Sequence, residues 1–166
     1  SQEICFVTDN NYAGFISSKL KEPMQPGYFV DTEGNILGEH KGIYNYTIGQ
    51  RKGLGISLGK PMYVVKIDAE NNTVVLGESG KEYSHGLIAT DLNWIAFGRL
   101  ESPRKAMAKI RYSAKESEAV ISPLENDKVK VEFTYPQRAV TPGQAVVFYE
   151  GDIVLGGGMI EEQINE

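Results

Sequence analysis

The feature that most constrains this chain is a period-two alternation of apolar and polar residues in its second half. In residues 128–133, Val129, Val131 and Phe133 alternate with charged residues. Successive side chains of a strand point to opposite faces, so this pattern predicts a half-buried β-strand. Polar turns, several with Gly, Pro or Asn, separate five further candidate strands: 87–94, 106–112, 118–123, 144–149 and 153–161. Six short strands at this spacing predict a closed, six-stranded β-barrel at the C-terminus.

The glycine run 156–158 interrupts the last of these expected strands. It lies between two apolar pairs, Val154-Leu155 and Met159-Ile160. Glycine inside a strand pattern is typical of a bulge or a close approach of two backbones, so we expect a bulge or a barrel corner here.

The first half of the chain predicts a smaller module with the only clear helix. Asp9 is a candidate N-cap, the apolar residues at positions 12, 15, 16 and 20 share one helical face, and Pro23 stops the helix. The pattern then becomes strand-like, with candidate strands at 27–30, 36–40, 62–67 and 73–76, of which the last two read as a hairpin. Between them, residues 41–56 combine β-formers with a basic loop punctuated by glycine.

The predicted fold class is therefore mainly β, in three parts. Residues 1–20 hold Cys5 and the short helix, and we expect them to be the tail of a domain outside this chain. Residues 21–82 form a central β-rich module, and residues 83–166 form the barrel. The polar, glycine-containing stretch 77–82 marks the last boundary.

Composition excludes several classes of protein. Hydrophobic residues make up 41% of the 166 residues, which is enough for a packed core. No apolar run approaches the ~18 residues of a membrane span, and the N-terminus does not resemble a signal peptide. The single cysteine allows no internal disulfide, so a reducing, cytoplasmic setting is expected. His40 and His85 lack the spacing of a zinc site, and no metal site is expected.

The distribution of charge points to a local patch for RNA. A net charge of −5 argues against non-specific nucleic-acid binding by the whole surface. One segment is nevertheless basic and contains only one acid, Glu101, against six cations: Arg99, Arg104, Lys105, Lys109, Arg111 and Lys115. RNA contact is therefore open in this segment.

Three places hold residues that could carry chemistry or contact RNA. Cys5 precedes the expected helix start, where backbone amides can stabilise a thiolate, but a lone cysteine also behaves as a small buried hydrophobe. Arg111 and Tyr112 are expected to end a strand; Arg can grip phosphate and Tyr can stack on an unpaired base, or both can be ordinary surface and core residues. Gln144 lies in a turn and could read a base or a phosphate.

The glycine-rich segment 49–55 also has two readings. Gln50, Arg51 and Lys52 can contact phosphate or base, and the flanking glycines permit close backbone approach. The segment lacks the strand–loop–helix setting and the Gly-Lys-Ser/Thr ending of a phosphate-binding P-loop. The other reading is a tight, solvated turn, and the residues leave both readings open.

Four segments, taken in order, resemble the tRNA-specific 2-thiouridylases. They are 1–6 (SQEICF), 46–54 (YTIGQRKGL), 108–112 (AKIRY) and 139–149 (AVTPGQAVVFY), the last continuing to 155–158 (LGGG). Each alone is a weak match, whereas four in the family's order, with a cysteine in the first, are specific.

The resemblance implies a chemistry and a set of partners. It implies an ATP-binding domain before Ser1, absent here, that adenylates the position-two oxygen of the wobble uridine in tRNA. It makes Cys5 a catalytic cysteine that carries sulfur as a persulfide, supplied by a sulfur-relay protein or a cysteine desulfurase. It places Arg111, Tyr112 and Gln144 in contact with tRNA, and gives Gln50, Arg51 and Lys52 an RNA-side or structural role. This chain alone is expected to be inactive.

Two other functions fit the same sequence. A non-catalytic RNA-binding barrel of translation-factor type would not need Cys5. A structural or protein-interaction module would show no salt-dependent binding of tRNA.

Overall fold

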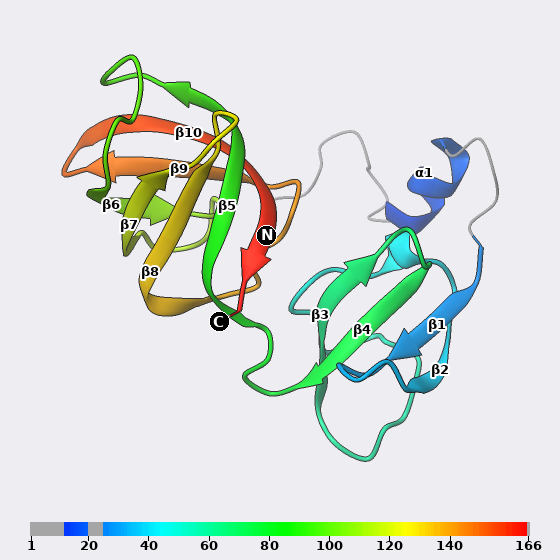
Figure 1. Ribbon diagram of the computed structural model, residues 1–166. Helices are drawn as coiled ribbons and strands as arrows, with labels where there is room; N and C mark the ends of the chain where they lie inside the picture. The colour runs from blue at the N-terminus through cyan, green and yellow to red at the C-terminus, as the bar shows by residue number, and fades with distance from the viewer. Residues whose placement is uncertain (1–11, 20–24, 166) are drawn as a thin grey trace. The chain divides into compact units, whose positions relative to one another are not determined.

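The computed structural model describes residues 12–19 and 25–165, which are mainly β as predicted. The described elements are α1 (Tyr12–Lys19), β1 (Gly27–Val30), β2 (Ile36–His40), the 3-10 helix η1 (Ile43–Asn45), β3 (Met62–Asp68), β4 (Thr73–Glu78), β5 (Tyr83–Trp94), β6 (Arg104–Lys109), β7 (Ser117–Pro123), β8 (Val129–Arg138), β9 (Ala145–Glu150) and β10 (Ile153–Ile164). They belong to two compact units, Ser1–Glu82 and Tyr83–Glu166 (Figure 1). Neither described helix has the length and apolar character needed to cross a membrane.

The first unit contains an open four-stranded sheet with the order β2-β1-β4-β3. The β3–β4 pair is the predicted hairpin, and β1 pairs antiparallel with β2. The central pair, β1 and β4, is parallel, with Phe29 opposite Val74. Both of these side chains are fully buried. This unit therefore packs its core against the middle of a small open sheet. The outer side of β3 is partly covered, because Val64 exchanges backbone hydrogen bonds with Gly49 and Gln50.

A buried histidine fixes the core of the first unit. The rings of Phe29, His40 and Tyr46 meet edge to face, with centroids 5.1–5.6 Å apart. The Gly42 N–H donates to His40 Nδ1 at 3.0 Å, so a neutral ring carries its proton on Nε2, which donates to the Asn72 carbonyl at 3.2 Å. Burial lowers the pKa of His40. The neutral ring thus joins β2 to the turn before β4.

The β-formers expected in residues 41–56 do not extend into a strand. Only η1 is regular there, and the chain then runs without strand structure to β3. Gly42, Gly49, Gly53 and Gly55 all have positive φ, between 72° and 110°. Repeated left-handed residues turn the chain and prevent an extended run, despite the β-forming residues of this segment.

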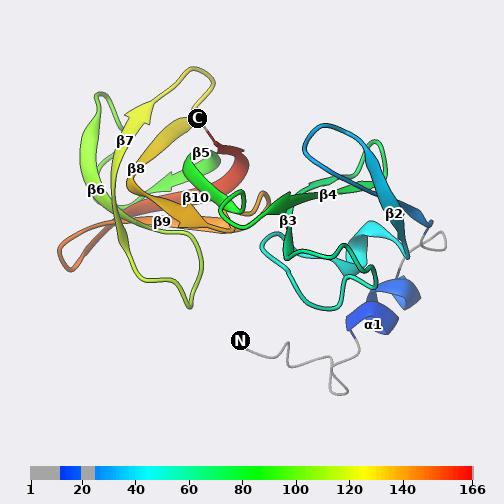
Figure 2. The ribbon, with the colours of Figure 1, turned by 90° about the horizontal axis from the view of Figure 1, so that it is seen from below.

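The second unit is the predicted six-stranded barrel. Its strands close in the order β10-β5-β8-β7-β6-β9, with β9 returning to β10 (Figure 2). All pairs in the ring are antiparallel. The first and last strands are neighbours, because Gly86 of β5 pairs with Ile164 of β10. Closure leaves this sheet with no free edge.

The barrel interior is an apolar cluster. Its sixteen buried members are Leu87, Ala89, Leu100, Ala106, Ala108, Ile110, Ala119, Ile121, Val129, Val131, Phe133, Val140, Val146, Phe148, Leu155 and Ile160. Trp94 stacks on Phe148 with ring centroids 5.7 Å apart. The alternation in the sequence thus predicted the buried face correctly.

The glycine run in β10 forms the predicted bulge. The pairing of β10 with β5 shifts between Gly157 and Met159. A Cβ on Gly157 would lie 2.6 Å from the Val146 carbonyl oxygen, and one on Gly158 would lie 2.5 Å from the Thr90 carbonyl oxygen. Only glycine permits this approach of neighbouring backbones.

Several barrel strands are longer than predicted, and β5 and β8 gain the most. β5 begins at Tyr83, because the exposed–buried–exposed alternation already starts at Tyr83, Ser84 and His85. β8 continues to Arg138, beyond Pro136, because its pairing with β5 is interrupted there and the missing N–H of proline breaks no regular ladder.

Candidate nucleic-acid interface

Arg111 and Tyr112 lie in a turn and do not end a strand, which corrects the sequence prediction. β6 stops at Lys109, and the Ala114 N–H donates to the Arg111 carbonyl at 3.1 Å. The buried Ile110 anchors the start of this loop, and the polar run after it has no alternation to continue a strand. Both Arg111 and Tyr112 are exposed, so the turn presents them to solvent.

Gln144 lies in a second loop whose backbone is held firmly. The Gly143 N–H donates to the Ile160 carbonyl, and the Ile160 N–H donates to the Gln144 carbonyl, both at 2.8 Å. The Thr141 hydroxyl donates to the Ala139 carbonyl at 3.0 Å. The Gln144 side chain is exposed, so a fixed backbone carries an outward-facing amide.

The barrel topology brings these two loops to one end. β6 and β9 are antiparallel neighbours, with Lys109 opposite Val147. The chain that leaves β6 and the chain that enters β9 therefore emerge at the same end of the barrel. We call this the Arg111 end; its two loops are residues 110–116 and 139–144. The sequence could not predict this proximity, because it depends on which strands are neighbours.

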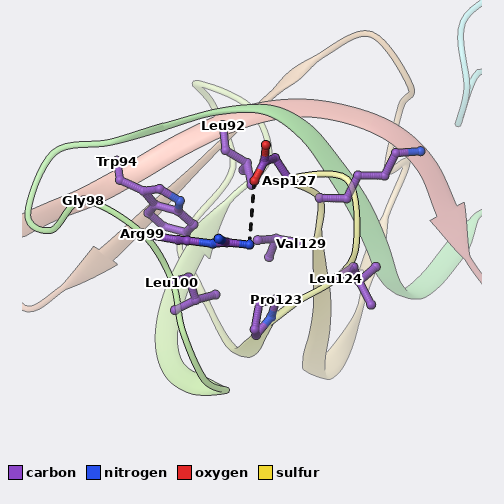
Figure 3. A pocket seen from close by; sticks show the side chains of 10 residues that line it. Leu92, Trp94, Gly98, Arg99, Leu100, Pro123, Leu124, Asp127 and Val129 are labelled. Carbon is purple, nitrogen blue, oxygen red and sulfur yellow. Dashed lines mark ion pairs between the residues drawn. The ribbon is translucent and has the colours of Figure 1, made fainter.

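The opposite end, which we call the pocket end, is formed by residues 95–103, 124–128 and 151–152. A cavity of about 280 Å³ opens there, with a mixed lining in which the apolar Leu92, Trp94 and Leu100 stand beside charged side chains (Figure 3). Arg99 and Asp127 form an ion pair of 3.9 Å at this cavity.

The loops of the two ends differ in charge. The two loops of the Arg111 end hold two cations, Arg111 and Lys115, against Glu116 alone. The pocket end has two cations against four acids: Arg99, Lys128, Glu101, Glu125, Asp127 and Asp152. A polyanion is therefore attracted to the Arg111 end and opposed at the pocket end.

The cations also differ in what they already bind. Arg99 pairs with Asp127, and Lys128 pairs with Glu161 at 2.6 Å. Among the described residues, no ion pair includes Arg111 or Lys115. Lys109 lies 6.0 Å from the centre of the Tyr112 ring, at cation–π distance. The loop that holds Arg111 and Lys115 thus also carries the exposed Tyr112, with Lys109 of β6 over its ring.

The glycine-rich loop of the first unit is organised around Gln50. Its Oε1 accepts the Thr47 N–H, and its Nε2 donates to the Lys52 carbonyl, both at 3.0 Å. Ile48 and Leu54, on either side, are buried. The amide of Gln50 is therefore occupied by the loop's own backbone, whereas Arg51 and Lys52 are exposed.

Cys5 lies outside the described residues. Within the described part of the chain, no three His, Cys, Asp or Glu side chains gather into a group that could hold a metal ion. Of the predicted site residues, the structure places Arg111, Tyr112 and Gln144 at the same end of the barrel.

Each of the two units matches a known family of protein domains. A family model described as a tRNA methyl transferase PRC-barrel domain matches residues 13–78. A second, described as an aminomethyltransferase beta-barrel domain, matches residues 84–160.

Whole-chain relatives decide the family. The chain is 66% identical to the tRNA-specific 2-thiouridylase MnmA of Acetivibrio thermocellus over 161 residues, covering 97% of this chain and 45% of the relative. It is 62% identical to MnmA 1 of Thermoanaerobacter pseudethanolicus over 164 residues, covering 99% of this chain and 45% of the relative. The chain belongs to the tRNA-specific 2-thiouridylase family.

The same matches give the share of a thiouridylase's length that this chain covers. The MnmA of Desulfitobacterium hafniense is 54% identical over 169 residues, which cover 96% of this chain and 46% of that relative. The chain therefore spans a little under half the length of these relatives and matches the C-terminal part of the thiouridylase family.

Proposed function

We propose that this chain is the central and C-terminal part of a cytoplasmic tRNA 2-thiouridylase, in which it supplies tRNA contacts and one catalytic cysteine. The parent enzyme would replace the position-two oxygen of the wobble uridine with sulfur. This activity is consistent with the names of the relatives, which describe tRNA-specific 2-thiouridylases.

One observation carries the tRNA contact. Arg111 and Tyr112 lie at the same end of the barrel as Gln144, and no acid among the described residues pairs with Arg111. A free guanidinium can grip a phosphate bidentately, an exposed phenol ring can stack on a base, and an exposed amide can read a base edge. The three side chains together offer each kind of contact that RNA recognition uses.

Cys5 is proposed to carry the sulfur. A cysteine suits this task because its sulfur is polarisable, accepts a second sulfur as a persulfide, and gives it up by thiol exchange. The persulfide would come from a sulfur-relay protein or a cysteine desulfurase. The outer sulfur would then reach the uridine either directly or after a second cysteine of the parent releases it as sulfide.

ATP belongs to the part of the parent outside this chain. Its role there would be to turn the position-two oxygen into a leaving group. The sequence of this chain has no P-loop, and segment 49–55 is built around the structural amide of Gln50. No residue of this chain is assigned to ATP.

The assignment of Cys5 is tested by the Cys5→Ser substitution in the full-length parent. We expect tRNA thiolation to be lost while the Kd for tRNA stays within about twofold, because the change removes a sulfur carrier and leaves the barrel intact. Thiolation would be followed by mass spectrometry of tRNA nucleosides. Unchanged thiolation would instead favour a non-catalytic RNA-binding barrel.

A second experiment tests whether this part suffices for catalysis. The 166-residue chain, incubated with tRNA, ATP and a persulfide donor, is expected to give no 2-thiouridine. Turnover by the chain alone would contradict the assignment of activation to another domain.

A further inference from the structure

The two most exposed aromatic side chains of the barrel are unusual, because tyrosine rings normally bury most of their surface. Tyr112 is 79% exposed and Tyr135 is 74% exposed. Among the described residues, no other large hydrophobic side chain reaches these values. Tyr112 is already part of the proposed tRNA contact, whereas Tyr135 has no role in it.

A large irregularity in β8 places Tyr135 outside the regular ladder. Gln137 pairs with Ser84 and Glu132 pairs with Gly86, so four residues of β8, 133–136, face one residue of β5, His85. The Gln137 Nε2 donates to the Tyr135 carbonyl at 2.7 Å and braces this stretch. A bulge of this kind redirects a side chain away from the position that simple alternation would give it.

Tyr135 stands at the Arg111 end of the barrel. β7 and β8 are antiparallel neighbours, with Ala119 opposite Phe133. The chain just before β7 is the loop 110–116, which carries Arg111 and Tyr112. The end of β8 therefore lies at the same end of the barrel as this loop, and so does the Gln144 loop that follows β8.

The surroundings suit a nucleotide better than an apolar partner. The two free cations of the loop, Arg111 and Lys115, belong to the same end, and Lys109 lies over the Tyr112 ring. Aromatic rings that alternate with cations are the arrangement with which proteins hold single-stranded nucleic acid, since bases stack on rings and phosphates meet cations. In a duplex the base faces are hidden, so a duplex gains nothing from exposed rings.

We propose that Tyr112 and Tyr135 are stacking platforms for unpaired nucleotides of the tRNA, with the adjoining phosphates on Arg111 and Lys115. The proposal rests on the proposed function and deepens it: this end of the barrel recognises a single-stranded or looped segment of tRNA and not a stem. Tyr135 is then a further binding residue that determines which part of the tRNA is held.

The test compares Tyr135→Ala with Tyr135→Phe in the 166-residue chain. Kd is measured by fluorescence anisotropy for tRNA, for a single-stranded oligonucleotide with the sequence of its anticodon loop, and for a blunt RNA duplex. Tyr135→Ala is expected to weaken binding of tRNA and of the single strand by roughly 5- to 150-fold, the range for loss of one stacked base. Tyr135→Phe keeps the ring and is expected to stay within about twofold of the wild type.

Two control variants separate the possible failures. Tyr44→Ala removes a tyrosine of the first unit that is 54% exposed and is expected to leave all three Kd values unchanged. Arg111→Ala reports on the proposed function itself. If Arg111→Ala weakens tRNA binding and Tyr135→Ala does not, stacking at Tyr135 is wrong and the proposed tRNA interface stands.

Other results overturn more or less of the proposal. Equal losses on the duplex and the single strand would contradict recognition of unpaired nucleotides. A loss with Tyr135→Phe as large as with Tyr135→Ala would assign the effect to the hydroxyl and not to the ring. If the wild-type chain binds no tRNA at all, both the stacking proposal and the role of this chain as an autonomous tRNA contact are wrong.

Discussion

The barrel and the β1–β4 unit differ in how their backbone N–H and carbonyl groups find hydrogen-bond partners. The barrel closes its sheet, and its interior cluster is wholly apolar. The smaller unit has an open sheet and a long irregular segment, and it uses the side chains of His40, Gln50 and Asn72 to satisfy its backbone. Where neighbouring strands do not supply hydrogen-bond partners for the backbone, polar side chains supply them.

This difference decides which residues are free for function. Gln50 appeared as a candidate RNA contact, yet its amide is bonded at both ends within its own loop. Arg111 and Tyr112 have no comparable structural role, because neither belongs to the hydrophobic core of the barrel. The barrel core leaves Arg111 and Tyr112 exposed and outside it, whereas the smaller unit uses the Gln50 amide within its own loop.

The largest expected effect is the loss of a core ring from the barrel. Phe148→Ala should destabilise the barrel by about 3–5 kcal/mol, since Phe148 is fully buried and leaves a cavity. Trp94, the only tryptophan, stacks on Phe148 and reports on the barrel in a denaturant titration followed by fluorescence. Phe29→Ala, the matched change in the other unit, should leave this transition where it is. A shift of equal size with Phe29→Ala would show that the two units unfold as one.

Next in size is the effect of Arg111→Ala on tRNA binding. We expect a loss of about 1–3 kcal/mol in binding free energy and a salt dependence shallower by about one counterion. Arg99→Ala, at the pocket end, is the control, because Arg99 already pairs with Asp127. Titrations with tRNA at several salt concentrations provide the measurement. Similar losses for both variants would mean that the barrel has no preferred end for RNA.

A smaller effect is expected from Gln50→Ala. The change removes two hydrogen bonds to backbone groups, so the first unit should lose about 1–2 kcal/mol of stability. The Kd for tRNA should stay unchanged. Hydrogen exchange at the amides of β3 and β4 would measure the stability. If the variant is as stable as the wild type but binds tRNA more weakly, Gln50 is an RNA contact and not a structural residue.

The smallest expected effect is a dependence on pH that is confined to the first unit. Burial lowers the pKa of His40, so the unfolded chain takes up its proton at higher pH than the folded one. Stability from the neutral ring is complete above the ordinary histidine pKa of about 6.5 and is lost as pH falls below it. Hydrogen exchange between pH 7 and pH 5 should show β1 and β4 loosening before the barrel, and His40→Gln should abolish the difference. Parallel loosening of both units would contradict this.

The sequence predicted the barrel well because alternation records burial directly. Val129, Val131 and Phe133 are buried as expected. Strand ends were harder, since Tyr112 favours a strand by residue type, yet the chain turns after Ile110. The proximity of the Gln144 loop could not be predicted, because neighbouring strands are set by closure.

The sequence prediction of the candidate site is incomplete at Tyr135 and untested at Cys5. Tyr135 was missed, although the proline after it signals an interrupted ladder in a strand that is otherwise regular. Cys5 lies outside the described residues, and its role as a sulfur carrier stays a prediction.

The pairing of the first barrel strand with the last has a consequence for how this unit can be used. Gly86 lies opposite Ile164, and the Ser84 hydroxyl donates to Asn165 Oδ1 at 2.9 Å, so the unit enters and leaves its fold at one place. A domain with adjoining ends can be grafted into a surface loop of another protein, or its ends joined and new ones opened elsewhere, without stretching the chain. The barrel therefore has the geometry of a transferable unit, and the loop at 151–152, at the opposite end from Arg111, is the expected place for new chain ends.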